Sequence, residues 1–84
     1  RLIEVKAVSP KTFKFYFSKK EMDIAKQMGK KYHLYLLPVL HNSDFDISSL
    51  KIIKDPINHL FNHQEGWNVE VENLSFQIIN WSGN

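Results

Sequence analysis

A glutamate and a lysine two positions apart near the start of the chain are the residues whose types and spacing best suit chemistry. Glu4 and Lys6 lie in an alternating segment, residues 1–8, which predicts a strand with both side chains on one face. Their Cα atoms would then be about 6.5–7 Å apart. The carboxylate can hold Mg²⁺, and the ammonium can orient water and stabilise charge on a phosphate. The pair suits metal-assisted phosphodiester hydrolysis, but it is equally the pattern of a surface ion pair.

A basic helix is expected to follow this strand and its neighbour. Ser18 and Glu21 have the spacing of a capping box, in which each side chain hydrogen-bonds the backbone N–H of the other residue. Apolar residues at helical spacing come next, and Gly29 ends the pattern, which predicts an amphipathic helix over about residues 19–29. The cap accounts for Glu21 without a function, but its carboxylate could also be an accessory acidic group of the site.

The pattern around this helix predicts an α/β (α+β) fold with a small mixed β-sheet. Residues 12–17 alternate after a Ser-Pro break, which predicts a strand that forms a β-hairpin with the first strand. The apolar run that begins at Tyr32 predicts a strand over about 32–38, buried on both faces, with Pro38 near its end. Further along we expect a loop over 41–49, a short strand over 50–53, a short helix near 56–62 that opens at Asp55-Pro56, and two C-terminal strands from Trp67 onward.

Composition and charge exclude some classes of protein and favour others. The 84 residues include no cysteine, which excludes disulfides and thiolate chemistry, and no apolar stretch is long enough to span a membrane. We therefore expect an intracellular, cytoplasmic protein. Residues 1–31 have a balance of +6, whereas residues 32–84 have a balance of −4, which points to an anionic partner such as DNA. Four lysines are candidates for contacts to DNA phosphates, or alternatively form a solvated surface: Lys11, Lys14, Lys19 and Lys20.

Several of these features, in this order, resemble the C-terminal domain of NO VEIN-type proteins, a branch of the PD-(D/E)xK nuclease superfamily. The resemblance covers about residues 2–56. It rests on Ile3-Glu4-Val5-Lys6, Phe17-Ser18, Glu21, Ala25, Tyr32-x-Leu34-Tyr35 and Asp55-Pro56. It implies a partial restriction-endonuclease-like core with Glu4 and Lys6 at the catalytic position. It also implies Mg²⁺ or Mn²⁺ held by Glu4 and the backbone carbonyl of Val5.

The sequence departs from the superfamily pattern at one important position. Nucleases of this kind take a second metal-binding carboxylate from a strand before the Glu-x-Lys strand, and only residues 1–3 precede Glu4 here. Glu4 and one carbonyl make a poor magnesium site. We therefore expect residues 1–84 to form a single truncated domain that binds no metal and does not cleave DNA by itself. The exposed sheet edge of such a domain favours a homodimer or a strand-swapped assembly.

Two functions follow from this reading. The first is a nuclease-like domain of a larger DNA-processing, restriction or phage-defence protein, active as a metal-dependent nuclease only in the full-length context. Its partners would be DNA and the remainder of the parent protein, such as a helicase or ATPase module. The alternative is a non-catalytic DNA-binding or protein-interaction module that keeps the nuclease fold.

Overall fold

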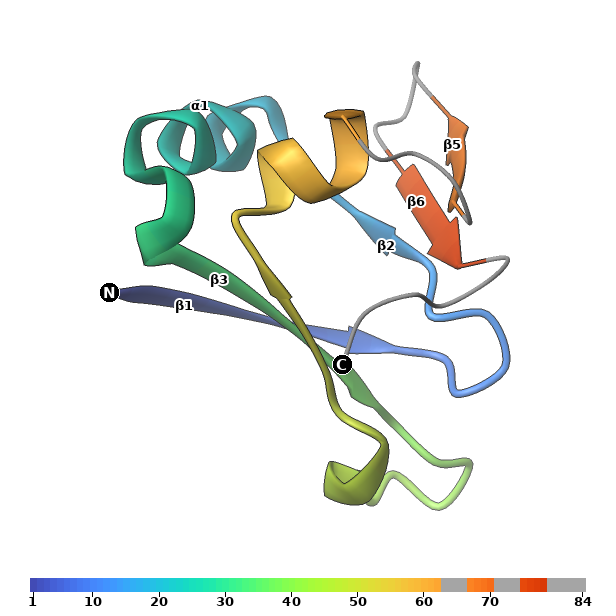
Figure 1. Ribbon diagram of the computed structural model, residues 1–84. Coiled ribbons are helices and arrows are strands. Elements are labelled where there is room, and N and C mark those ends of the chain that lie inside the picture. The colour runs from blue at the N-terminus through green and yellow to red at the C-terminus, as the bar shows by residue number, and fades with distance from the viewer. Residues whose placement is uncertain (63–66, 71–74, 79–84) are drawn as a thin grey trace.

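The computed structural model describes residues 1–62, 67–70 and 75–78, and its main element is a three-stranded sheet, called sheet A here (Figure 1). Sheet A contains β1 (Leu2–Val8), β3 (Tyr32–Pro38) and β4 (Lys51–Lys54), in the order β1-β3-β4. β1 and β3 are parallel, whereas β3 and β4 are antiparallel. A parallel pair needs a crossover connection, and helix α1 (Lys19–Met28) lies in that connection. The predicted mixed sheet is confirmed.

Helix α1 begins and ends where its capping residues predict. The Ser18 hydroxyl oxygen accepts a hydrogen bond from the Glu21 N–H at 3.1 Å, and the Ser18 N–H donates to Glu21 Oε1 at 2.9 Å. Gly29 has a φ of 55°, a left-handed conformation that favours glycine, and its N–H donates to the Ala25 carbonyl. The 3₁₀ turn η1 (Gly29–Lys31) then leads into β3. The predicted helix over about 19–29 is therefore confirmed.

A second, antiparallel sheet has the strand order β2-β6-β5. It consists of β2 (Phe15–Tyr16), β5 (Trp67–Glu70) and β6 (Ser75–Ile78), so that two C-terminal strands are present as predicted. Val71, Asn73 and Leu74, which the sequence placed in these strands and their turn, lie outside the described residues.

The predicted hairpin between the first two strands is wrong, because β1 pairs with β3 and β2 pairs with β6. The alternating segment over 12–17 shortens to a strand of two residues. Phe13 has a φ of 52°, which interrupts the extended backbone between the turn and Phe15. The side chains of Phe13, Phe15 and Phe17 are nevertheless all buried, but the alternation did not predict the strand that β2 pairs with.

The core lies between one face of sheet A, helix α1 and the β2 segment. It is formed by Val8, Phe13, Phe15, Phe17, Ala25, Tyr32, Leu34, Leu36, Ile53 and Leu60. β3 is central in the sheet, with Pro38 at its end as predicted, but only alternate residues of β3 are buried. His33, Tyr35 and Leu37 are half-buried on the opposite face. The expectation of burial on both faces is therefore wrong, because the core elements pack against one face only.

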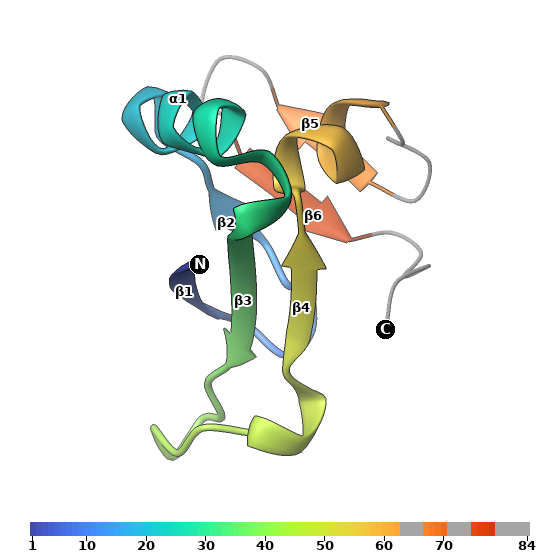
Figure 2. The ribbon, with the colours of Figure 1, turned by 60° about the vertical axis from the view of Figure 1, so that its left-hand side comes forward.

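Figures 1 and 2 show the two helical segments at one end of sheet A and the 3₁₀ turn η2 (Ile47–Ser49) at the other end. The chain forms a helical turn at Pro56-Ile57 and continues as the π-helix η3 (Asn58–Asn62), which agrees with the predicted short helix near 56–62. In the described part of the chain, no helix combines the length and the apolar character needed to cross a membrane.

Candidate functional site

Strand β1 places Glu4 and Lys6 on the face of sheet A that carries the core. Side chains along β1 alternate between partly buried and exposed, and Glu4 and Lys6 belong to the partly buried set, as the sequence predicted. The Val8 carbonyl accepts a hydrogen bond from the Val39 N–H at 2.9 Å, on the β3 side. Backbone directions alternate along a strand, so the Val5 carbonyl points away from β3, toward the open edge of the sheet.

Lys6 joins β1 to the start of helix α1 through Glu21. Its Nζ donates to both carboxylate oxygens of Glu21, at 2.8 and 2.7 Å, and lies 4.0 Å from Glu4 Oε1. Glu21 is 15 positions from Lys6 in the sequence. The same carboxylate caps α1, so Glu21 makes the helix cap and the contact with Lys6 at the same time.

The two carboxyl groups have different electrostatic surroundings. Burial opposes ionisation of Glu21, but hydrogen bonds from Lys6 and from the Ser18 N–H outweigh it and lower the pKa of Glu21 to about 2. Burial and the neighbouring Glu21 raise the pKa of Glu4, against the opposing charge of Lys6. Lys6 therefore interacts mainly with Glu21. The positive charge of Lys6 compensates the negative charge of Glu4 less well. We call these three residues the acidic–lysine cluster.

Tyr32, which the sequence indicated only as a strand start and as part of the family motif, also lies close to the cluster. It is the first residue of β3, and its side chain is buried among the core residues. Burial raises the pKa of Tyr32 to about 12, and the charges of Glu4 and Glu21 act in the same direction. Tyr32 and Leu34 are two positions apart in the predicted strand, so their side chains were expected on the same face. That spacing was the signal in the sequence that could have linked Tyr32 to the core face.

The cluster supplies only part of a magnesium site. Both oxygens of Glu21 bind Lys6, so the Glu4 carboxylate and the Val5 carbonyl are the oxygen donors that remain for a cation. Within residues 1–62, 67–70 and 75–78, no three His, Cys, Asp or Glu side chains come together as metal ligands would. Mg²⁺ needs six oxygen ligands in near-octahedral geometry. The donors of the described residues therefore do not fit a complete site.

The four lysines proposed for DNA contacts do not lie in one place. Lys19 and Lys20 are exposed at the start of α1, next to the cap. Lys14 Nζ lies 5.7 Å from the centroid of the Tyr16 ring. Lys11 lies in the turn between β1 and β2, and Figure 1 shows this turn at the far end of β2 from α1.

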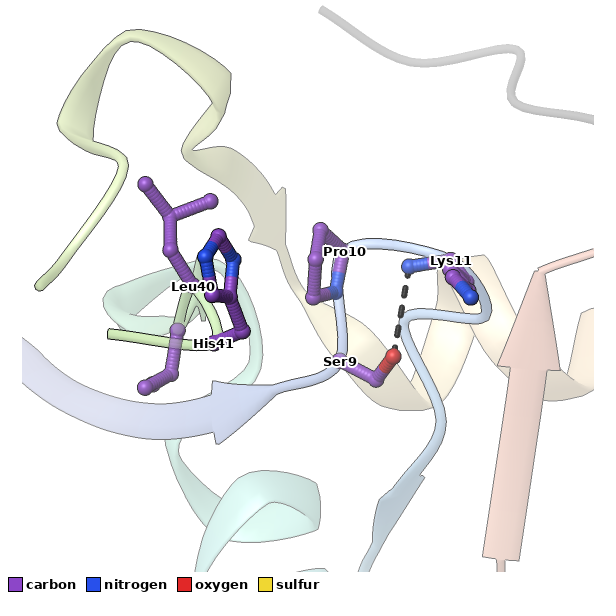
Figure 3. Close-up of a pocket in the computed structure, with 6 residues that line it drawn as sticks. Ser9, Pro10, Lys11, Leu40 and His41 are labelled. Atoms are coloured by element: carbon purple, nitrogen blue, oxygen red, sulfur yellow. Dashed lines mark hydrogen bonds between the residues drawn. The ribbon is translucent and has the colours of Figure 1, made fainter. Parts of the chain in front are cut away.

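Lys11 instead lines an open pocket of about 490 Å³ (Figure 3). The Lys11 N–H donates to the Ser9 hydroxyl oxygen at 3.2 Å, which shapes the turn. The pocket is lined by Ser9, Pro10, Lys11, Val39, Leu40 and His41. None of its lining residues belongs to the acidic–lysine cluster, so the structure separates Lys11 from the site on β1.

Comparison with known proteins covers the part of the chain that contains sheet A and α1. No curated protein and no solved structure matches the chain. The family model described as Protein NO VEIN, C-terminal, matches residues 1–53, which include β1, β2, α1, β3 and the first part of β4. The match covers more than half of the 84 residues and includes the whole acidic–lysine cluster. The chain therefore belongs to the NO VEIN C-terminal family.

Proposed function

We propose that this chain is a nuclease-like domain of a DNA-processing protein, in which the acidic–lysine cluster forms one side of a phosphodiesterase site. The observation that carries the proposal is the position of Lys6 Nζ, which lies 2.7 Å from Glu21 and 4.0 Å from Glu4 on one face of β1. A lysine fixed between two carboxylates can stabilise the charge that develops on a phosphate. The contact with a second element distinguishes this arrangement from an ion pair confined to one strand.

The local electrostatics support a division of roles. Glu21 holds Lys6 in place, because its carboxylate is itself fixed by the Ser18 N–H. Glu4 keeps the less compensated charge and lies beside the Val5 carbonyl, so it is the carboxylate available to a cation. The cluster does not complete a magnesium shell, so a further carboxylate from outside the described residues has to contribute. We therefore expect the chain alone to leave DNA uncut.

Plasmid nicking with Mg²⁺ or Mn²⁺ tests this expectation. The wild type and Glu4→Ala should give the same background of nicked DNA across a metal titration. Nicking by the wild type that disappears in Glu4→Ala would overturn the expectation of an inactive chain and would make Glu4 catalytic. Nicking retained in Glu4→Ala would count against the site itself, because another group would then be responsible.

DNA binding by the start of α1 is the second part of the proposal. Lys19 and Lys20 lie at the positive end of the helix dipole, where phosphate oxygens are favoured. Removing two phosphate contacts should lower the salt slope of log K by about 1.8. We expect this change in Lys19→Glu/Lys20→Glu, measured by fluorescence anisotropy with duplex DNA between about 50 and 200 mM salt.

A matched variant separates local contacts from net charge. Lys30→Glu/Lys31→Glu changes the charge by the same amount in the turn η1, at the other end of α1. This variant should keep most of the salt slope. Equal losses in the two variants, or an unchanged slope in Lys19→Glu/Lys20→Glu, would remove the proposed contact. Absence of duplex binding by the wild type at low salt would contradict the DNA-processing function.

A further inference from the structure

The edge of sheet A formed by β1 is open along its whole length within the described residues. β1 is the terminal strand in the order β1-β3-β4, and Figure 2 shows it at one margin of the sheet. The Val8–Val39 hydrogen bond and the parallel register place Leu2, Glu4, Lys6 and Val8 as the residues bonded to β3. The N–H and C=O groups of Ile3, Val5 and Ala7 therefore point to the open edge.

The side chains next to this edge are apolar and accessible. Ile3 is 41% exposed and Val5 54% exposed, and Ala7 is exposed as well. They neighbour Tyr35 and Leu37 of β3, which are half-buried on the same face. An edge strand with unpaired backbone groups and apolar side chains is a template for another strand.

The sequence of β1 is complementary to itself in reverse. When two antiparallel copies are aligned with Val5 opposite Val5, Glu4 of each copy lies opposite Lys6 of the other. Ile3 then lies opposite Ala7, and Leu2 lies opposite Val8. Alignments centred on Glu4 or on Lys6 instead place like charges opposite each other, which destabilises a strand pair.

The backbone geometry favours the same alignment. Ile3, Val5 and Ala7 carry the outward N–H and C=O groups, so the Val5–Val5 and Ile3–Ala7 pairs become hydrogen-bonded pairs, with about six bonds in total. Glu4 and Lys6 then form the non-hydrogen-bonded pairs, in which opposite Cα atoms are closer, at about 4.5 Å. Charge, apolar contact and hydrogen bonding thus agree on one register.

We propose that the open edge of β1 pairs with β1 of a second copy of this chain, antiparallel and centred on Val5. The two three-stranded sheets would then form one continuous sheet around a two-fold axis. Each Glu4 would gain Lys6 of the second copy as a neighbour, and the two acidic–lysine clusters would lie on the same face. This pairing does not depend on nuclease activity, and it would compete with a cation, because it engages the Val5 C=O and brings Lys6 of the second copy to Glu4.

Charge placed on the two-fold axis tests the pairing. Val5→Lys sets two lysines opposite each other, and its dimer dissociation constant should rise at least about tenfold. Val5→Glu should weaken the dimer similarly, whereas an equimolar mixture of both variants should restore association, because lysine then opposes glutamate. Sedimentation velocity between about 20 µM and 1 mM covers the range expected for a small interface.

A control variant places the added charge outside β1. Ile47→Lys removes an apolar side chain that is 72% exposed in η2 and adds the same charge away from β1. It should associate as the wild type does. A wild type that stays monomeric throughout, a Val5→Lys variant that associates as strongly as wild type, or a mixture that fails to associate would each overturn the proposal.

Disulfide trapping tests the register independently, because the chain has no cysteine of its own. Hydrogen-bonded antiparallel pairs have Cα atoms about 5.5 Å apart, within the range for a disulfide. Val5→Cys should cross-link to itself on oxidation with copper phenanthroline. Ile3→Cys should cross-link with Ala7→Cys faster than with itself. Faster self-linkage of Ile3→Cys would contradict the alignment on Val5.

Discussion

The two sides of β1 differ in the contacts that their side chains make. On the core side, Lys6 is fixed by two hydrogen bonds to Glu21 and lies opposite buried Leu36 in the register. On the other side, Val5 is more than half exposed, and its backbone groups face the open edge. One strand therefore carries a side that stabilises the fold and a side available for association. Substitutions on the first should change the free energy of unfolding, and substitutions on the second should change self-association.

The largest difference in stability is expected between two neighbouring leucines of β3. Leu36 is completely buried, whereas Leu37 is half-buried on the opposite face. Leu36→Ala should lower the free energy of unfolding by about 3 kcal/mol, because it removes buried methyl groups and leaves a cavity. Leu37→Ala should lower it by about 1 kcal/mol. Urea denaturation measures both, and equal losses would show that the two faces are equally packed.

Lys6→Met should have the next largest effect. Methionine keeps the length of the apolar stem but removes the ammonium that bonds Glu21 and neighbours Glu4. We expect the free energy of unfolding at neutral pH to fall by about 2 kcal/mol, since the Lys6–Glu21 pair is partly buried. Val5→Thr, the control on the exposed side, should change it by less than about 0.5 kcal/mol. If Lys6→Met leaves the free energy of unfolding unchanged, the capping box alone orders Glu21.

The two glutamates should respond oppositely to neutralisation and to pH. Glu21→Gln should lower the free energy of unfolding by about 1.5 kcal/mol at neutral pH, whereas Glu4→Gln should leave it unchanged or raise it slightly. The pKa of Glu21 is about 2 in the folded chain, below its ordinary 4.5, so its contribution is present above pH 4.5 and disappears as the pH falls toward 2. Glu4 has a raised pKa, so its ionisation reduces stability as the pH rises through that value.

Acid titration of the two variants distinguishes these contributions. Urea midpoints between about pH 7 and pH 2 should fall less steeply below pH 4.5 in Glu21→Gln than in the wild type. Below pH 4.5, the urea midpoint of Glu4→Gln should fall as steeply as that of the wild type. A steep loss below pH 4.5 that survives in Glu21→Gln would assign it to other carboxylates of the chain.

The sequence predicted elements well where the information was local. The capping box from Ser18 to Glu21 and the stop at Gly29 set both ends of α1, since each device acts within one helical turn. Alternation in β1 correctly placed Glu4 and Lys6 on one face. The C-terminal strands were also predicted, but the pairing of β6 with β2 was not, because strand partners are chosen by tertiary packing rather than by the strand's own pattern.

The sequence offered Glu21 as an accessory acidic group, but it did not predict the direct contact between Glu21 and Lys6. Glu21 reaches Lys6 only because the crossover brings the start of α1 over β1, and no spacing rule links positions 15 residues apart in two different elements. Phe13 illustrates a second limit. Its side chain is buried, but the positive φ that shortens β2 is rare for a bulky residue and cannot be expected from residue type.

The smallest effect is expected from Ser18→Ala, which removes the hydroxyl that accepts from the Glu21 N–H. The loss should be about 1 kcal/mol in the free energy of unfolding, as for other N-cap serines, and Ser18→Thr should retain most of it. The informative measurement is the double variant Lys6→Met/Ser18→Ala. Glu21 takes part in both the cap and the ion pair, so the combined loss should be smaller than the sum of the single losses. Strict additivity would mean that the cap and the site on β1 are independent, and that Glu21 does not link the helix to the strand.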